Sequence, residues 1–323
     1  MKIGVLGTGW IVNPITKTLK GMSNMECYAI ASRTKERGEQ AAKEFGYKVG
    51  YGSYEELVAD PQVELVYVAT PHSRHYEDMK LCIAAGKNVL CEKAFTLNAA
   101  QAEEIRRLAK AAGVYVAEAI WTRYQPARKL IDDTIASGII GKVYNLTANL
   151  SYAMMEKERI YNPALAGGAL LDLGVYGINF ALMHFGEDIV RMESSVQMLD
   201  TGVDGMEVIT LFYRDGRVAV LTHGAYGRSD RKGVFYGDQG YMIVENINNP
   251  QSIAVYDTND NLLQFIPVPE QITGYEYQFA EAADCIEDGK LESDSMPMED
   301  TVKVMRVMDA LRKQWGMAYP QEK

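Results

Sequence analysis

The chain has 323 residues, of which 47% are hydrophobic and 24% charged, an ordinary balance for a globular protein long enough for two domains. Its net charge of −10, with no run of lysine or arginine, argues against a nucleic-acid surface. We find no apolar run close to the roughly 20 residues of a membrane span, and no room for a signal peptide before the first expected strand. Four isolated cysteines predict reduced thiols and a cytoplasmic location.

The start of the chain predicts nucleotide binding. A short apolar strand breaks at Gly7-Thr8-Gly9, and a helical pattern follows. Gly7 would allow a tight turn, and Gly9, which has no Cβ, would let the main chain approach a pyrophosphate at the helix start. Trp10 lies in the same turn, and we include it among the expected cofactor contacts. Because Val12 stands where Gly or Ala is usual, the motif alone also fits an ordinary turn between strand and helix.

Strand and helix patterns alternate up to residue 120 and predict a Rossmann dinucleotide-binding domain over residues 1–120 of an α/β protein. Alternation at this spacing is typical of a parallel sheet covered on both faces and joined by right-handed crossovers. The expected strands are Glu26–Ser32, Leu65–Thr70, Asn88–Cys91 and Val114–Ala119, and the expected helices are Lys35–Phe45, His75–Ala85 and Ala99–Ala112.

The end of the second strand bears on the choice of cofactor. An Asp or Glu about 20 residues beyond the glycine turn would bind the adenosine ribose and favour NAD. The strand ends instead in Ser32 and Arg33, with no acid. A hydroxyl and a guanidinium can hold a 2′-phosphate, so we expect NADP, with NAD possible. The alternative interpretation of Arg33 is that it is a solvent-exposed residue at the start of a helix.

Two further strand ends are expected to line the cofactor. Thr70, Pro71 and His75 follow the carboxyl end of a strand, where ligands bind in open α/β sheets. His72 and His75 have no cysteine or carboxylate cluster beside them, so we expect no metal site. At the next strand end, Lys93 has two interpretations that the residues leave open: it reaches the nicotinamide, or it pairs with the neighbouring Glu92 on the surface.

Residues 121–323 predict an α+β domain with a large, mainly antiparallel open sheet. Helices are expected at Pro126–Ser137, Ala169–Phe185, Tyr275–Asp288 and Met298–Trp315, a first strand at Lys142–Tyr152, and turns at Asp215-Gly216, Gly237–Gly240 and Thr258–Asn261. The segment Met154–Leu165 is irregular and polar, and is interpreted as a substrate lid or a long surface loop.

The sheet strands suggest self-association. In Val208–Tyr213 and Val218–Leu221 both alternating sets of side chains are largely apolar. A sheet with one solvated face alternates more cleanly, so something besides the helices of this domain should cover the second face. We expect a homodimer formed through this sheet.

Asp172 and Tyr176 stand four residues apart in an apolar helical segment, and therefore on one helix face. Both have structural alternatives. The carboxylate could complement the positive start of the helix, and the tyrosine could be a core aromatic with a satisfied hydroxyl.

The chain resembles the Gfo/Idh/MocA oxidoreductases, which include glucose–fructose oxidoreductase and inositol dehydrogenase. The resemblance covers almost the whole chain and rests on the glycine turn, Thr70–His72, Gly86–Lys93 and Gly167–Tyr176. The run Glu118–Tyr124 is most similar to the branch of dimeric dihydrodiol dehydrogenases and NADP-xylose dehydrogenases.

The resemblance implies catalytic positions and an activity. It places Lys93, Asp172 and Tyr176 in catalysis, and Glu92, Trp121 and Arg159 among cofactor and substrate contacts. The activity it implies is NADP(H)-dependent hydride transfer to or from a secondary alcohol or hemiacetal of a small sugar, polyol or cyclic diol. The alternatives are an NAD-linked polyol or inositol dehydrogenase, and a non-catalytic NADP-sensing protein on the same scaffold.

Tyr176 would then take the hydroxyl proton as hydride leaves. A free tyrosine has a pKa of about 10 and is a weak base at neutral pH, but the Lys93 ammonium would favour its phenolate and stabilise an alkoxide. Where the family usually has proline after the lysine, this chain has Ala94. Because a cis bond before alanine costs about 3–4 kcal/mol, we predict a trans peptide between Lys93 and Ala94.

Overall fold

The computed structural model describes residues 1–322 and separates into two units, each built from two segments of the chain. The first unit comprises Met1–Tyr124 and Gln271–Met305; the second comprises Gln125–Glu270 and the chain from Arg306 onward. The division we expected, into 1–120 and 121–323, therefore needs a correction, because residues 271–305 group with the N-terminal part. The reason is packing: Phe279, Ala282 and Cys285 of α9 (Glu276–Glu287) belong to the hydrophobic core around the first strand.

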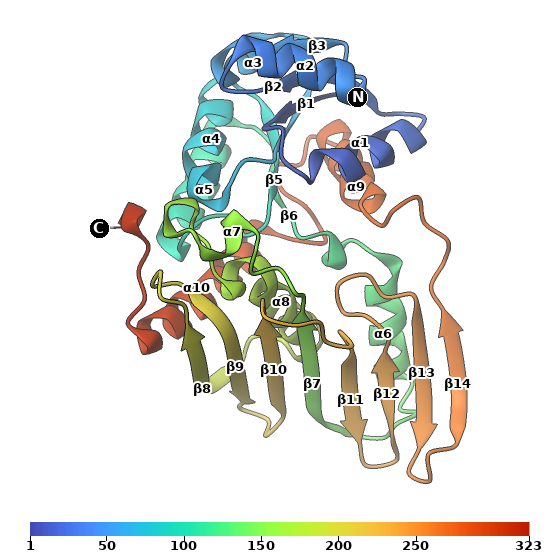
Figure 1. The fold of residues 1–323 in the computed structure, drawn as a ribbon. Helices are drawn as coiled ribbons and strands as arrows, with labels where there is room; N and C mark the ends of the chain where they lie inside the picture. The colour runs from blue at the N-terminus through green and yellow to red at the C-terminus, as the bar shows by residue number, and fades with distance from the viewer. Residues whose placement is uncertain (323) are drawn as a thin grey trace. The chain divides into compact units, whose positions relative to one another are not determined.

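The first unit contains the expected parallel sheet, which confirms the Rossmann prediction. Within the described residues its six strands lie in the order β3-β2-β1-β4-β5-β6, and each neighbouring pair is parallel (Figure 1). The strands are β1 (Lys2–Leu6), β2 (Glu26–Ala31), β3 (Val49–Tyr51), β4 (Leu65–Val68), β5 (Asn88–Glu92) and β6 (Val116–Ala119).

The helices of this unit start and stop at residues that favour helix ends. The side chains of Thr34, Ser53 and Asn98 cap three helix starts by accepting main-chain N–H bonds, and Gly46 and Gly113 end two helices in the left-handed conformation. The helices are α1 (Val12–Gly21), α2 (Lys35–Phe45), α3 (Tyr54–Ala59), α4 (His72–Ala84) and α5 (Ala99–Ala112), with a 3₁₀ turn η1 (Trp121–Arg123).

The second unit contains the expected open sheet. Across residues 1–322 its eight strands lie in the order β14-β13-β12-β11-β7-β10-β9-β8, and neighbours are antiparallel except β7 and β10, which run parallel (Figure 1). The three predicted turns are confirmed as hairpins. The strands are β7 (Val143–Ser151), β8 (Ile189–Met198), β9 (Asp204–Tyr213), β10 (Val218–Gly224), β11 (Gly233–Gly237), β12 (Gly240–Val244), β13 (Ser252–Asp257) and β14 (Leu262–Pro267).

The helical segment expected at Ala169–Phe185 begins differently from an ordinary helix. Leu170–Gly174 forms a π-helical turn, which continues as α8 (Val175–Phe185). The segment predicted to be irregular contains the short helix α7 (Glu158–Tyr161) and the 3₁₀ turn η2 (Pro163–Leu165). The remaining elements are α6 (Pro126–Ala136), α10 (Met298–Trp315), which the unit boundary divides at Met305, and the 3₁₀ turn η4 (Pro320–Glu322).

One apolar stretch is longer than we expected from the sequence. The segment Pro163–Phe185 is long and apolar enough, by length and composition, to cross a membrane. However, 89% of its most apolar window is buried inside the protein, and α8 packs against β7 and β10. This burial is the pattern of a core helix.

The two faces of the eight-stranded sheet differ in burial. Side chains on one face, such as Ile209, Leu221 and Phe235, are fully buried. On the other face Tyr236 is 40% exposed, and it continues a row across the strands through Tyr241 and Tyr256. The rings of Tyr241 and Tyr256 stack with centroids 5.0 Å apart. The second unit therefore leaves an aromatic sheet face partly open.

Candidate active site

The glycine turn has the geometry that a pyrophosphate requires. Gly7 has a φ of +104°, and a Cβ there would lie 2.7 Å from the Ala69 carbonyl oxygen, so a side chain is excluded. A Cβ at Gly9 would meet only that same oxygen, at 4.0 Å, which leaves open space beside the main chain. In the described chain no side chain caps the start of α1, and the neighbouring Trp10 is 61% exposed. The turn therefore fits a dinucleotide phosphate at a helix start.

The chain that follows β2 carries two arginines, and one of them contacts this turn. Ser32 is buried, whereas Arg33 is exposed and forms no ion pair among residues 1–322. Arg37, on the first turn of α2, donates from Nε to the Thr8 hydroxyl at 3.3 Å and from Nη2 to the Thr8 carbonyl at 3.5 Å. Our sequence analysis missed Arg37. The available signal was its place on the first turn of the helix that follows the second strand, which begins just after Arg33.

The loops that follow β4 and β5 are joined by His75. Its ring is fully buried, and its two nitrogens lie 2.8 Å from the carbonyl oxygens of Thr70 and Ala94. The Thr70 hydroxyl in turn donates to Asp78 at 2.7 Å, and Pro71 precedes α4 as its N-cap residue. Burial lowers the pKa of His75, so the neutral ring donates to one carbonyl at a time. His75 thus fixes the two loops relative to each other.

Glu92 and Lys93 are not a solvent-exposed charge pair. Glu92 is only 9% exposed, and its carboxylate accepts a hydrogen bond from the Tyr67 hydroxyl in the core, while Lys93 is half-buried. The peptide between Lys93 and Ala94 is cis, so our prediction of a trans bond is wrong. That prediction weighed only the local preference of the bond, whereas Ala94 is fully buried and its carbonyl faces His75.

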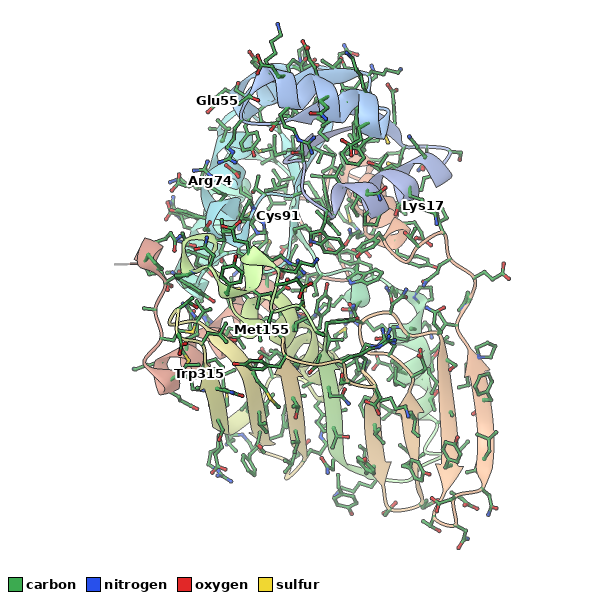
Figure 2. The ribbon with its side chains drawn as sticks, viewed as in Figure 1. Lys17, Glu55, Arg74, Cys91, Met155 and Trp315 are labelled. Carbon is green, nitrogen blue, oxygen red and sulfur yellow. The ribbon has the colours of Figure 1, made fainter. Side chains whose placement is uncertain are left out.

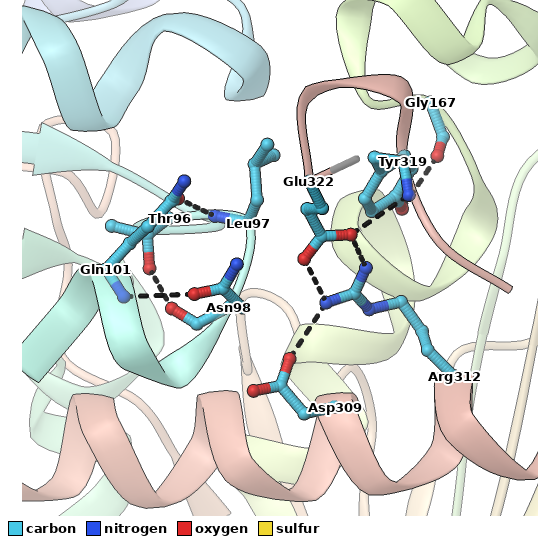
Figure 3. Close-up of polar contacts among 9 residues, drawn as sticks. All are labelled: Thr96, Leu97, Asn98, Gln101, Gly167, Asp309, Arg312, Tyr319 and Glu322. Carbon is cyan, nitrogen blue, oxygen red and sulfur yellow. Dashed lines mark hydrogen bonds and ion pairs between the residues drawn. The ribbon is translucent and has the colours of Figure 1, made fainter.

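The chain beyond Lys93 is fixed by a network at the start of α5, shown on the left of Figure 3. The Thr96 hydroxyl donates to the Asn98 carbonyl at 2.8 Å. The Asn98 side chain accepts from the Gln101 main chain at 3.0 Å, and the Gln101 side chain accepts from the Leu97 main chain at 3.0 Å. This reciprocal capping, together with the contact of His75, sets the path of the chain that carries Lys93.

Trp121 is part of an aromatic stack in the first unit. It is 6% exposed, and its ring lies 4.0 Å from that of Tyr275 at an angle of 11°. Two residues further, Arg123 is buried and pairs with Asp300 at 2.8 Å. Burial raises the pKa of Glu118, on the adjoining strand β6, to about 7. The stacked rings of Trp121 and Tyr275 present a buried apolar surface.

The second unit brings together two of the predicted site residues. Asp172 lies in the π-helical turn and Arg159 on α7, and their side chains form an ion pair at 3.2 Å. The Asp172 side chain is 6% exposed and that of Arg159 30%. Tyr176, in the first turn of α8, is 8% exposed. The π-helical turn is a feature that often occurs at functional sites, and it carries the carboxylate that the sequence singled out.

The structure also bears on metal and thiol chemistry. Within residues 1–322, no group of three or more His, Cys, Asp or Glu side chains is arranged to hold a metal ion. All four cysteines are unpaired. Cys91, labelled in Figure 2, lies on β5, and burial raises the pKa of its thiol well above the ordinary value. A buried protonated thiol of this kind is unreactive.

Comparison with protein families gives matches in both parts of the chain. Residues 1–119 match the oxidoreductase family with an NAD-binding Rossmann fold, GFO_IDH_MocA. Residues 124–243 match the GFO/IDH/MocA C-terminal domain.

Several characterised proteins are similar over their full length. A trans-1,2-dihydrobenzene-1,2-diol dehydrogenase from Mus musculus is 31% identical over 336 residues, covering 100% of this chain and 99% of its own. A D-xylose 1-dehydrogenase (NADP(+)) from Hypocrea jecorina is 33% identical and covers 99% of this chain and 93% of its own.

Solved structures have the same fold. A 3-ketoreductase from Actinomadura kijaniata, in complex with NADP and TDP-benzene, superposes with a TM-score of 0.87 at 25% identity over 97% of each chain. An aldose-aldose oxidoreductase from Caulobacter crescentus, complexed with glycerol, gives a TM-score of 0.87 at 22% identity over 98% of each chain, which supports the fold alone.

Proposed function

Since the chain belongs to the GFO/IDH/MocA oxidoreductase family, we propose that it transfers hydride between NADP(H) and a secondary alcohol or hemiacetal of a small sugar, polyol or cyclic diol. The observation that carries this proposal is the similarity, over essentially the whole chain, to a dehydrogenase of a cyclic diol and to one of a sugar. The two substrates share vicinal hydroxyl groups on a ring, and we propose that the substrate of this enzyme carries the same group.

The choice of NADP is supported by the basic residues beside the glycine turn. Gly7, Gly9 and the start of α1 would hold the pyrophosphate. Ser32 and Arg33 would hold the 2′-phosphate, and Arg37 adds a second guanidinium that already contacts the turn. The nicotinamide, when bound, supplies the hydride acceptor or donor. The further residues that we propose to contact the cofactor are Trp10, Thr70, Pro71, Glu92, Lys93 and Trp121, with His75 acting indirectly through its two loops.

We assign the chemical step to Lys93, Asp172 and Tyr176. Tyr176 would accept the proton of the substrate hydroxyl, and the Lys93 ammonium would stabilise the negative charge that develops during the step. Asp172 would bind a substrate hydroxyl, in an orientation that its ion pair with Arg159 fixes. Arg159 would donate to further substrate oxygens, and Trp121 would provide an apolar wall.

A substrate screen tests the function directly. The purified protein is incubated with monosaccharides, inositols and cyclic trans-diols, each with NADP and with NAD, and the absorbance of reduced nicotinamide is followed. We expect turnover with at least one ring hydroxyl substrate and a higher kcat/KM with NADP. No turnover across the panel in either direction would refute the proposed function, and a preference for NAD would refute the role given to Ser32 and Arg33.

We also propose a cytoplasmic homodimer. The open aromatic face of the eight-stranded sheet, including Tyr236, Tyr241 and Tyr256, would be covered by the same face of a second copy. The unpaired state of all four cysteines supports a reducing compartment. Light scattering at micromolar concentration should give twice the chain mass of 36.0 kDa. A monomeric mass would contradict the dimer. If the Tyr241→Asp variant kept the dimeric mass, the interface would have to lie on another surface.

A further inference from the structure

Three ionisable side chains lie buried on the inner face of the second sheet. Asp204 starts β9, Glu207 follows on the same strand, and His223 lies opposite Glu207 on β10. None of the three is more than 1% exposed, and His223 Nδ1 lies 3.3 Å from Glu207 Oε1. The function proposed above does not use them. Burying three such groups costs free energy that hydrophobic side chains would not require, so their presence needs an explanation.

The helix that carries Asp172 and Tyr176 packs directly on this cluster. The π-helical turn contacts β9 and β10, and α8 contacts β10. Three glycines make this close approach possible. A Cβ at Gly168 would lie 3.0 Å from Asp204 Cγ, one at Gly174 would lie 2.6 Å from Glu207 Oε1, and one at Gly177 would lie 2.8 Å from His223 Cε1. Asp172 and Tyr176 fall between these contact points along the chain.

The start of the π-helical turn is held at its main chain. The Asp204 carboxyl accepts the N–H of Leu170, the first residue of the turn, at 2.5 Å. The Tyr319 hydroxyl donates to the Gly167 carbonyl at 2.9 Å, and Tyr319 is itself placed by the Arg312–Glu322 ion pair, as the right side of Figure 3 shows. The first residue of the turn and the chain just before it are therefore fixed by polar side chains and not by apolar packing alone.

Burial disfavours the charged form of each of the three groups. Burial, together with the nearby Glu207, raises the pKa of Asp204 to about 8, and burial raises the pKa of Glu207 well above its ordinary value. Burial lowers the pKa of His223 to about 3. Burial thus favours the protonated form of both carboxyl groups and the neutral form of the imidazole. An amide has nearly the shape of a protonated carboxyl group and, like it, carries a carbonyl acceptor beside a donor, which gives a conservative replacement.

We propose that Asp204, Glu207 and His223 are positioning residues, which set the geometry of the π-helical turn and thereby the orientation of Asp172 and Tyr176. This inference rests on the proposed function, because it assumes that Asp172 and Tyr176 act in the reaction. It deepens that function by assigning the buried cluster to the reaction geometry.

The experiment compares Glu207→Ala, Glu207→Gln and a control, Leu211→Ala, which removes a buried side chain from the same face of β9. For each variant we would measure kcat, substrate KM, the Kd for NADP and hydrogen exchange of the amides of residues 168–177. Glu207→Ala should lower kcat by about tenfold or more, leave the Kd for NADP within about twofold, and speed exchange at 168–177. Glu207→Gln should restore most of kcat, and Leu211→Ala should lower stability without lowering kcat.

The outcomes separate this inference from the proposed function. If the wild-type protein turns over no substrate in the panel, the proposed function fails, and the exchange data still show whether the cluster holds the turn. Unchanged exchange at 168–177 in Glu207→Ala, or wild-type kcat despite faster exchange, would overturn the positioning role. A kcat for Glu207→Gln as low as that for Glu207→Ala would also overturn it. If Glu207→Ala does not fold, His223→Ala is measured against the same criteria.

Discussion

A methyl group added at Gly177 perturbs the contact between α8 and the sheet at one defined point. The new Cβ would lie 2.8 Å from Cε1 and 3.1 Å from Cδ2 of His223, and closer still to Nε2. An ordinary contact begins at 3.4 Å, so the Cε1 contact alone must lengthen by 3.4 − 2.8 = 0.6 Å, and the Nε2 contact by more. His223 cannot simply rotate away, because it is fully buried on a strand paired on both sides. The helix must therefore move.

The structure sets the size of the expected effects. Overpacking of a core costs about 1–3 kcal/mol, whereas alanine in place of glycine in a helix gains about 0.5–1 kcal/mol. The net loss of stability for Gly177→Ala should therefore be roughly 0.5–2 kcal/mol, too little to unfold a typical domain. Tyr176 is the adjacent residue, and a misplacement near 1 Å can reduce turnover by about 10²-fold. We expect kcat to fall by about 10–10²-fold in a protein that remains folded.

Urea unfolding and steady-state turnover would be measured for Gly177→Ala and for a control, Gly227→Ala, whose added Cβ meets nothing within 4 Å. The control should change stability by less than about 0.5 kcal/mol and leave kcat unchanged. A double variant, Gly177→Ala with His223→Ala, removes the clashing ring, and the free-energy coupling between the two substitutions should be favourable. Wild-type kcat in Gly177→Ala, despite the expected loss of stability, would refute the reasoning.

Three further predictions concern the proposed roles. Lys93→Ala and Tyr176→Phe should each lower kcat by at least about 10²-fold while the Kd for NADP changes little; near-normal turnover in both would remove these residues from the chemical step. Arg33→Ala should weaken NADP binding by about 10–10²-fold, as expected for lost charge-assisted hydrogen bonds, and leave NAD binding unchanged. Binding of both cofactors would be measured by fluorescence titration, with Arg107→Ala, at an exposed position on α5, as the control variant. If Arg33→Ala weakened NADP and NAD binding equally, the assignment of Arg33 to the 2′-phosphate would be contradicted. Because the pKa of Asp204 is raised to about 8, its contribution to stability is largest below about pH 4 and is lost as the pH rises to about 8. The free energy of unfolding of Asp204→Asn should therefore increase relative to that of wild type between pH 5 and pH 8. Urea titrations that give the same difference between the two proteins at pH 5 and at pH 8 would be inconsistent with that pKa.

Features that depend on local sequence were predictable. The glycine turn at Gly7 and the hairpin at Asp215-Gly216 follow from conformations that few other residues adopt, and both occur in the structure. Helix α5 has the predicted bounds, because Asn98 and Gly113 mark its ends chemically. By contrast, β3 and α3 escaped prediction, because three and six residues are too short to show a period.

Features that depend on tertiary contacts were not predictable in the same way. The first N–H of the π-helical turn at Leu170–Gly174 is accepted by Asp204, which lies 34 residues away in the sequence. The grouping of α9 with the first unit depends on where Phe279 packs, which its own sequence pattern does not specify. One signal for the buried cluster was present. Glu207, Ile209 and Leu211 are spaced two residues apart and therefore point to the same face of the sheet. The sequence thus places an ionisable residue among the side chains expected to be buried.

The division of the chain has a consequence for dissecting this enzyme. Neither unit is a continuous piece of polypeptide, since the chain leaves the first unit after Tyr124, re-enters it at Gln271 and leaves again within α10 after Met305. A fragment truncated at Tyr124 would expose the core surface that α9 normally fills with Phe279 and Ala282. An isolated nucleotide-binding half would therefore have to be made by splicing 271–305 onto 1–124 through a designed linker. Residues 1–124 alone would leave part of their apolar core surface exposed and prone to aggregate.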